Sequence, residues 1–349
     1  MICDEHVIDN YSDMTISRGI ANLGVSGISV SSMTFKTAYH MEYIGQAAET
    51  VLSNVSNIPT YYVNKREYND GIWSVECLDR CAFLDQPIDT EHWTKTADNK
   101  YNISALEVGL RDVIGFGSVE FPQYMPTYIP CDMVDGQTYQ SVLSSIATAF
   151  CGFFCSYSTN ALSFIRYDNS GVSATVFEDY STIHDAGQFN FSPIAVTDGN
   201  VSQTFSHSGS VSTGLNINSP LADLESPNIE MLYSTLSSLY WQGWSCDNAV
   251  CDVGYLPMLG GRVTFSDGQS TVLKRVTNMT ARIIGDVAIV SASQEIPQMG
   301  EIQRRGLLQQ KLDETISSMK VYKNVKVTPT GAKAVPDKDN EKPRPTPQS

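Results

Sequence analysis

The chain has 349 residues, a length that favours two or three domains around more than one hydrophobic core and excludes a small disulfide-stapled scaffold. Charged residues make up 17% of it, against roughly 25% in an average soluble domain, while Ser, Thr, Gly, Asn and Tyr are abundant, which favours β structure. Its 23 Lys and Arg and 38 Asp and Glu give a formal net charge of −15, which argues against a grip on nucleic acid through neutralised phosphates.

The apolar pattern indicates neither a membrane span nor a secretory signal. The longest strongly apolar stretch, residues 146–154, is interrupted by polar and small residues and falls well short of the roughly 18 to 20 residues that a span needs. The first six residues contain no basic region, apolar region or small-residue cleavage site. We therefore expect no stable membrane insertion, and eight cysteines that are reduced when the chain is made.

Alternating apolar and polar residues predict extended chain in the N-terminal quarter. Residues 28–36 alternate with a slip of one residue at the serines 31–32, which predicts a strand with a bulge. Residues 60–78 contain two extended segments separated by Asn-Asp-Gly at 69–71. That arrangement predicts a hairpin with one buried face.

Two later segments change to helical spacing. Between Thr138 and Phe150, apolar residues recur on one helix face behind a threonine that can cap the first turn. A second helix is predicted to have Ser226 as its cap, Pro227 at its first helical position, and an apolar face that extends to Tyr240. Because both helices are amphipathic, we expect each to pack on a sheet.

Short alternating segments after the second helix predict a compact, antiparallel β-rich unit over residues 216–298. Strands are expected at 262–265 and 272–276, followed by a hairpin over 279–289 with a Gly-Asp turn.

From Glu301 the sequence becomes polar and helical. Four apolar residues line one side of this predicted helix: Leu308, Leu312, Ile316 and Met319. The helix could close a bundle if several copies meet, or dock on its own domain, and the sequence leaves both open. From Lys323 the chain is basic and contains several prolines, which predicts a linker or a disordered end.

Catalytic templates are missing from the sequence. It contains no Gly-x-Ser-x-Gly elbow, no His-Glu-x-x-His, no phosphate loop and no dinucleotide-binding glycine motif. His184 and Asp185 could form a general-base pair, but adjacent residues on an extended chain point to opposite faces. We therefore interpret both as structural.

Three pairs of cysteines could in principle hold zinc or an iron–sulfur cluster: Cys77 and Cys81, Cys151 and Cys155, and Cys246 and Cys251. Their spacing differs from the usual Cys-x-x-Cys knuckle. Cys151 and Cys155 also lie among phenylalanines, where a free thiol behaves as a small apolar side chain. We predict buried or free thiols and no metal.

The aromatic residues Tyr240, Trp241 and Trp244 admit two interpretations. They could stack a sugar or a base, or they could pack in the core at the end of the second helix, which is the more common role. We favour packing. The sequence thus predicts no catalytic, cofactor-binding or metal-binding residue, and no enzyme.

The order of the segments carries a further signal. An extended segment leads into a hairpin that ends in an apolar-x-Asp element, at residues 28–35, 59–63 and 66–80. A short helix and a strand follow, and then a helix and several strands: 138–150, 161–167, 225–241 and 259–289. This order resembles that of phage tail and baseplate hub proteins, in particular the late-control-D-like hub of contractile tails and phage-tail-like bacteriocins.

The resemblance implies an α+β, β-rich fold with two tube-like antiparallel β-barrel domains, a small α/β insertion, a C-terminal helix and a disordered tail. The implied parts are a first barrel over 1–85 completed by 185–215, an insertion over 86–184, a second barrel with its helix over 216–300, the C-terminal helix over 301–322, and the tail over 323–349.

The resemblance also implies a structural function. Three copies would form a ring of six barrels that joins the sixfold tail tube to the threefold central spike, with no cofactor. Its partners would be the tail tube or a distal tube-initiator protein, the spike, and baseplate wedge or fibre proteins, while DNA would at most pass through the lumen. The particle would be a virion or a phage-tail-like particle, assembled in the bacterial cytoplasm. The alternatives are a hub-associated peptidoglycan hydrolase and a glycan- or receptor-binding module.

Overall fold

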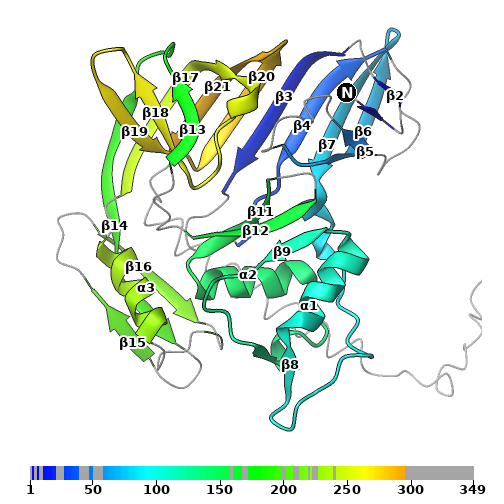
Figure 1. Cartoon of the computed structure of the whole chain (residues 1–349), viewed down its shortest axis with the longest axis vertical. Helices are drawn as coiled ribbons and strands as arrows, with labels where there is room; N and C mark the ends of the chain where they lie inside the picture. Colours follow the sequence, from blue (N-terminus) through cyan, green and yellow to red (C-terminus); the bar gives the residue numbers. More distant parts are fainter. Residues whose placement is uncertain are drawn as a thin grey trace, which may run out of the picture. The chain divides into compact units, whose positions relative to one another are not determined.

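Strands make up most of the secondary structure in this computed structural model, together with three α-helices in its described part (Figure 1). The helices are α1 (Ile103–Gly109), α2 (Tyr139–Ala149) and α3 (Pro227–Ser238). The structure describes residues 2–3, 6–7, 11–20, 27–38, 47–49, 58–157, 160–166, 172–197, 202–206, 212–218, 221, 227–238 and 241–294. The fold is α+β and rich in antiparallel strands, as predicted.

One large sheet contains most of the strands. In spatial order they are β15 (Ser202–Phe205), β14 (His184–Thr197), β17 (Trp241–Asp252), β21 (Val287–Gln294), β20 (Asn278–Ile284), β3 (Tyr11–Gly19), β4 (Ser32–Thr37), β7 (Ile72–Asp79), β6 (Tyr61–Asn69), β5 (Ala47–Glu49), β1 (Ile2–Cys3) and β2 (His6–Val7). A further strand, β16 (Ser212–Asn218), pairs with β14 in parallel. The order does not return on itself, so this sheet does not close into a barrel within the described residues.

Three small sheets accompany the large one. They are β10 (Tyr128–Pro130) with β8 (Lys100–Asn102); β11 (Gly152–Ser156), β12 (Ala161–Arg166) and β9 (Ser118–Glu120); and β13 (Val172–Phe177), β18 (Arg262–Ser266) and β19 (Thr271–Arg275). Four single-turn elements complete the description: η1 (Arg80–Asp85), η2 (Leu110–Ile114), η3 (Cys131–Met133) and η4 (Val253–Tyr255).

The large sheet brings together two regions that are far apart in the sequence. We call β3, β4, β7 and β6 its N-terminal half, and β14, β17, β21 and β20 its C-terminal half. The halves meet where β3 pairs antiparallel with β20, in register from Asn278 opposite Gly19 to Ile283 opposite Met14. We expected residues 185–215 to complete the N-terminal strands, but β14 instead pairs with β17, β15 and β16.

The predicted hairpin is confirmed. β6 and β7 pair antiparallel, and Asn69 lies opposite Ile72 across a two-residue turn. Asp70 and Gly71 have φ angles of 50° and 84°. Positive φ at both central positions defines the type I′ turn, whose twist matches that of the strands, and Asp-Gly is among the pairs that adopt it.

The predicted bulged strand over 28–36 is shorter than expected. β4 begins at Ser32, whereas Ile28 forms a separate bridge to Phe154 of β11. Between them, the backbone N–H of Ser31 donates to Oδ2 of Asp79 at 2.8 Å. The slip in the alternation therefore marks the point where the chain leaves β11 and joins the large sheet.

The helix predicted behind Thr138 is confirmed as α2. The Thr138 hydroxyl accepts a hydrogen bond from the N–H of Ser141 at 3.2 Å, and Val142, Leu143 and Ile146 are fully buried. The side chain thus satisfies one of the N–H groups that a helix leaves free in its first turn, and the apolar face packs on β11.

Replacing Thr138 with alanine should therefore lower the free energy of unfolding by about 1 kcal/mol, because the first turn of α2 loses its side-chain acceptor. Urea unfolding of the full chain measures this change. Thr138→Ser keeps the hydroxyl and should remain within about 0.5 kcal/mol of the parent. Equal losses in both variants would contradict a capping role.

The predicted C-terminal elements are also confirmed in type and order. α3 begins at Pro227, and β18, β19, β20 and β21 lie where alternation placed them, with Gly285 at φ 62° in the last turn. The predicted cap Ser226, the helix over 301–322 and the tail over 323–349 lie outside the described residues.

Candidate assembly interface

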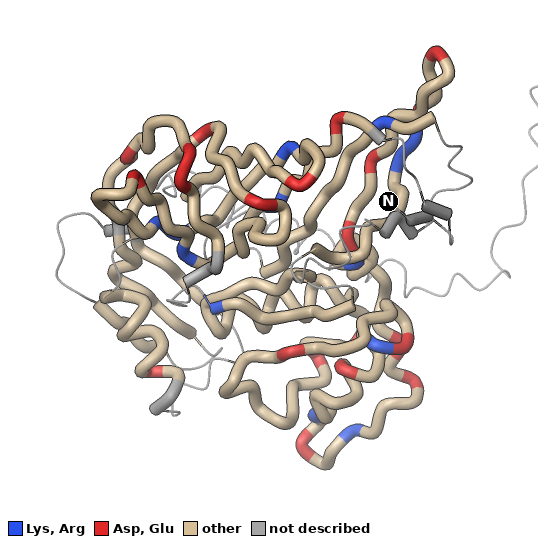
Figure 2. The backbone as a smooth tube through the Cα atoms, turned by 45° about the horizontal axis from the view of Figure 1, so that its top comes forward, with Lys and Arg blue, Asp and Glu red and all other residues tan. Residues whose placement is uncertain are grey.

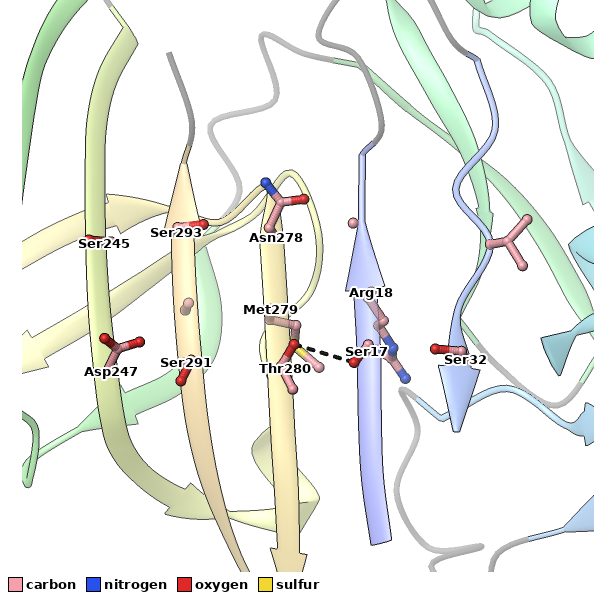
Figure 3. A pocket seen from close by; sticks show the side chains of 13 residues that line it. Ser17, Arg18, Ser32, Ser245, Asp247, Asn278, Met279, Thr280, Ser291 and Ser293 are labelled. Carbon is pink, nitrogen blue, oxygen red and sulfur yellow. Dashed lines mark hydrogen bonds between the residues drawn. The ribbon is translucent and has the colours of Figure 1, made fainter. Parts of the chain in front are cut away.

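The exposed face of the large sheet carries rows of small, uncharged polar side chains. One row runs across four strands: Ser291 of β21, Thr280 of β20, Ser17 of β3 and Ser32 of β4 lie directly opposite one another in turn. The hydroxyl oxygens of Ser17 and Thr280 are 3.3 Å apart (Figure 3). This contact joins the two halves of the sheet on its solvent side.

A second row runs beside the first. Ser245 of β17, Ser293, Asn278 and Gly19 are consecutive cross-strand partners. A Cβ atom on Gly19 would lie 2.6 Å from Oδ1 of Asn278, so a larger residue there would require the Asn278 amide to shift. The two rows line a shallow depression of about 550 Å³ (Figure 3).

Apart from the exposed carboxylate of Asp247 in β17, which lies beside the rows (Figure 3), charges on this face lie toward the other end of the strands, where they pair with one another. Lys36 contacts Asp13 at 3.2 Å, and Lys65 contacts Glu67 at 2.8 Å. The hydrogen bond to Glu67 raises the pKa of Lys65, and the same bond lowers the pKa of the carboxyl. Arg282 approaches Asp13 at 3.6 Å. These exposed pairs leave the end of the face close to neutral and contribute little to stability.

The opposite face of the same strands is apolar and buried. Met14 and Ile16 of β3 and Met279 and Ala281 of β20 alternate with the exposed residues and are at most 2% exposed. Period-two alternation thus gives the sheet one apolar face that packs in the core and one polar face that is exposed to solvent.

An acidic side chain lies within the buried layer. Asp79 is fully buried, and its two carboxylate oxygens accept from the N–H groups of Ser31 at 2.8 Å and Cys81 at 3.0 Å. Burial raises the pKa of Asp79 to about 7, while these hydrogen bonds and the charge of Arg18 oppose the rise. Tyr61 is adjacent, with its hydroxyl 2.6 Å from the Ser31 hydroxyl. The group ties β3, β4, β6 and β7 together beneath the exposed face.

The residues considered for chemistry do not assemble into a catalytic site. Asp185 pairs with Lys274 and also accepts from the side chain of Gln242, while His184 lies opposite Ser245 in the β14–β17 ladder. Asp185 therefore pairs with a lysine rather than with His184, which agrees with the structural interpretation of both residues.

The cysteines weighed as metal ligands are all buried, with no disulfide. Burial raises the pKa of Cys81 and Cys155 strongly and that of Cys251 to about 12, which disfavours the thiolate that binds metals. Within the described part of the chain, no group of three or more His, Cys, Asp or Glu side chains is placed to hold a metal ion.

The two tryptophans proposed as a possible sugar platform are inside the protein. Trp241 and Trp244 are 3% and 2% exposed. Nε1 of Trp244 donates to the carbonyl of Arg275 at 2.7 Å, and the Arg275 guanidinium lies 4.9 Å from the Trp241 ring. These two tryptophans therefore pack in the core, the interpretation we favoured, and do not form a sugar-binding platform. Tyr240 lies outside the described residues.

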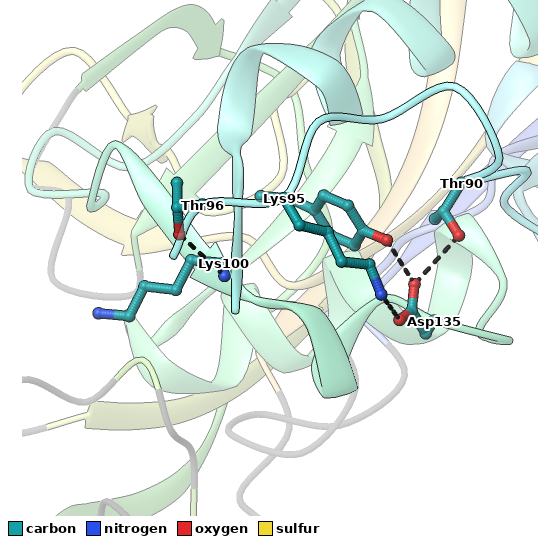
Figure 4. A network of polar contacts seen from close by, with 6 residues as sticks. Thr90, Lys95, Thr96, Lys100 and Asp135 are labelled. Atoms are coloured by element: carbon teal, nitrogen blue, oxygen red, sulfur yellow. Dashed lines mark hydrogen bonds and ion pairs between the residues drawn. The ribbon is translucent and has the colours of Figure 1, made fainter. Parts of the chain in front are cut away.

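A separate polar network holds the loop before β8. Asp135 accepts from Nζ of Lys95 at 2.9 Å, from the Tyr101 hydroxyl at 2.8 Å and from Thr90 at 3.0 Å (Figure 4). The hydrogen bond from Lys95 lowers the pKa of Asp135, and the bond to Asp135 raises the pKa of Lys95. All three donors to Asp135 lie within residues 90–101, so we assign the network a structural role in holding this segment.

The polar face is not among the features predicted from the sequence, although a signal for it exists. Small polar residues alternate with apolar ones at 14–17 in β3, at 278–281 in β20 and at 290–293 in β21. Within a single strand, this alternation indicates an ordinary solvent-exposed face. Only the pairing of neighbouring strands shows that the polar residues form continuous rows across the sheet.

None of the described helices is both long and apolar enough to cross a membrane. No protein-family model matches the sequence, and no curated protein sequence matches it.

Solved structures, however, share the fold. The 43 kDa tail protein of prophage MuSo2 from Shewanella oneidensis aligns with a TM-score of 0.50 at 12% identity, over 83% of this chain and 96% of that chain. A tail protein from Neisseria meningitidis MC58 aligns with a TM-score of 0.55 at 10% identity, over 83% of this chain and 93% of that one. The chain therefore has the fold of these phage tail proteins, which confirms, at the level of fold, the resemblance seen in the sequence.

Proposed function

We propose that this chain is a structural hub at the distal end of a phage tail or of a phage-tail-like particle. Three copies form a ring that joins a sixfold tail tube to a threefold central spike. The observation that carries the proposal is the β3–β20 pairing, which joins two halves of one chain into a single sheet with a continuous polar face. Three such chains supply six comparable sheet segments, the number that a sixfold tube presents.

The exposed face suits the wall of a lumen. Rows of Ser, Thr and Asn give water a surface without fixed positive charge, so DNA that passes through finds no phosphate-neutralising contacts. With a net charge of −15 per chain, the ring repels DNA rather than retaining it. The catalytic templates fail in the sequence, and the role proposed here is mechanical rather than enzymatic.

Open sheet ends favour assembly. The described strand order ends at β15 and β2, and unpaired strand edges tend to associate with further chain. In this proposal residues 1–85 and 216–300 form two tube-like barrel domains, residues 86–184 are the insertion, and ring neighbours protect the edges. The partners are tube, spike and baseplate proteins of a particle assembled in the bacterial cytoplasm.

Native mass spectrometry of the purified full chain tests this function. The expected species is a trimer of about 115 kDa, three times the chain mass of 38.4 kDa, which stained images should show as a ring. The same stoichiometry is expected in the isolated particle. A chain that is monomeric both in solution and in its native particle overturns the hub assignment.

A further inference from the structure

The β6–β7 hairpin projects beyond the strands beside it (Figure 2). β4 pairs with β7 only as far as Trp73, and β5 pairs with β6 only at Tyr61 and Tyr62. Beyond these points the hairpin has no neighbouring strand in the described sheet. Its tip exposes apolar side chains, with Tyr68 59% and Ile72 48% exposed.

One face of this tip is aromatic and basic. Tyr68 lies opposite Trp73, their ring centroids are 5.0 Å apart, and Arg66 lies 5.5 Å from the Trp73 ring. This face continues the buried face of the sheet, because Arg66 is also the cross-strand partner of the core residue Val75. Residues on the core-facing side of the hairpin therefore continue beyond the buried core and are exposed at the tip.

Arg66 lacks an anionic partner. No carboxylate among the described residues forms an ion pair with it, and its Nη1 is buried without a hydrogen-bond acceptor there. Arg66 as a whole is only half-buried, so a carboxylate supplied from outside this chain can pair with the accessible part of its side chain.

A complementary surface lies on the sheet formed by β13, β18 and β19. Val176, Thr264 and Leu273 form one cross-strand row on its exposed face, and the two apolar members are 45% and 44% exposed. The exposed carboxylates of Glu178 and Asp179 follow directly after β13. This surface is therefore apolar with an acidic border, whereas the hairpin tip is aromatic and carries an arginine.

The two surfaces lie on different halves of the large sheet. β13 and β19 both contact β17, and the backbone N–H of Val250 in β17 donates to the carbonyl of Asp179 at 2.8 Å. From β17 the order runs through β21, β20, β3, β4 and β7 to β6, six steps of about 4.8 Å or about 29 Å in total. They are too far apart to meet within one chain, and two unlike surfaces of one subunit generate a ring of copies when the rotation closes.

We propose that the β6–β7 hairpin tip of one copy docks on the β13–β18–β19 face of a second copy, with Tyr68 against the apolar row and Arg66 paired with the acidic border at Glu178. This inference rests on the proposed function, since it names the contact that closes the proposed ring. Charge complementarity and the apolar match select a second copy of this chain as the occupant.

Photo-cross-linking tests the contact. The full chain with p-benzoylphenylalanine in place of Tyr68 is irradiated, both purified and in the particle, and the joined peptides are identified by mass spectrometry. The expected product links residue 68 of one copy to residues 172–179 or 262–275 of another. The matched control places the probe at Tyr128, which is 47% exposed but lies outside both surfaces, and should give no such link.

Charge exchange provides the second measurement. Arg66→Glu and Glu178→Arg should each weaken trimer formation at least tenfold, and the double variant should recover most of the loss. Arg111→Glu, which reverses an exposed arginine elsewhere, should leave the trimer unchanged. Unfolding midpoints of all variants should match the parent, since the exchanged side chains contribute little to the core.

The outcomes separate the two claims. A trimer that persists with no link from residue 68, or with links to another segment or another protein, overturns this contact and leaves the hub assignment standing. If the double variant does not recover the trimer formation that each single variant loses, the pairing of Arg66 with Glu178 is also overturned. A parent chain that is monomeric in solution and in the particle overturns both.

Discussion

Replacing Asp79 with alanine should lower the free energy of unfolding by about 3 to 5 kcal/mol, one of the two largest single-residue effects we expect. The carboxylate is fully buried, and it satisfies the N–H groups of Ser31 and Cys81 near the charge of Arg18. Alanine leaves two buried donors without their acceptor and removes a carboxylate close to the charge of Arg18. Urea unfolding of the full chain measures the loss. A change under 1 kcal/mol would show that the group contributes little to holding β3, β4 and β7 together.

The Asp79→Asn variant adds a pH test. Burial raises the folded-state pKa to about 7, well above the usual value of about 3.9 in an unfolded chain. The folded state therefore binds the proton more tightly, and the stability that this provides is complete below pH 4 and is lost as the pH rises to 7. Relative to the asparagine variant, the parent should lose about 2 to 3 kcal/mol between pH 5 and pH 8. A difference that does not vary with pH would contradict the raised pKa.

Trp244→Ala should cost a similar amount, about 3 to 5 kcal/mol. Trp244 is buried between β17 and the β13–β18–β19 sheet, where its ring meets Phe265 edge-on at 5.5 Å. Its indole N–H donates to the Arg275 carbonyl. The substitution leaves a cavity and removes the hydrogen bond from the indole N–H, and thermal or urea unfolding should show both contributions together.

Two controls separate these contributions. Trp244→Phe keeps an aromatic ring near Phe265 but removes the donor, so it should cost about 1 to 3 kcal/mol. Tyr255→Ala removes an aromatic ring that is 55% exposed and should change the free energy of unfolding by less than about 0.5 kcal/mol. If Trp244→Ala were as mild as Tyr255→Ala, Trp244 would not be part of the core.

Local signals in the sequence predict much of the fold. Asp70-Gly71 identifies the hairpin because positive φ at both positions suits few residues, and Thr138 identifies the start of α2 because its hydroxyl replaces a missing carbonyl. Each signal depends on residues within four or five positions of one another. The strands β18 to β21 follow from alternation for the same reason.

Other features depend on information that local patterns do not contain. β17 was not predicted as a strand, because its register with β21 shifts between Cys246 and Ala249, where Asn248 has a φ angle of 57°, and this bulge breaks the alternation. Nor does the sequence show that Ser17 meets Thr280, since the two are 263 positions apart. The polar face exists only through that pairing, so its residues could be found individually but not as a surface.

The β3–β20 pairing also determines when the large sheet can form during translation. Ser17 leaves the ribosome 263 residues before Thr280, an interval of about 13 to 53 seconds at about 5 to 20 residues per second. Until then the outer edge of β3 has no partner, and the two halves of the sheet cannot meet. A nascent chain therefore completes the polar face of this sheet only after β20 has been made, near the end of the described residues.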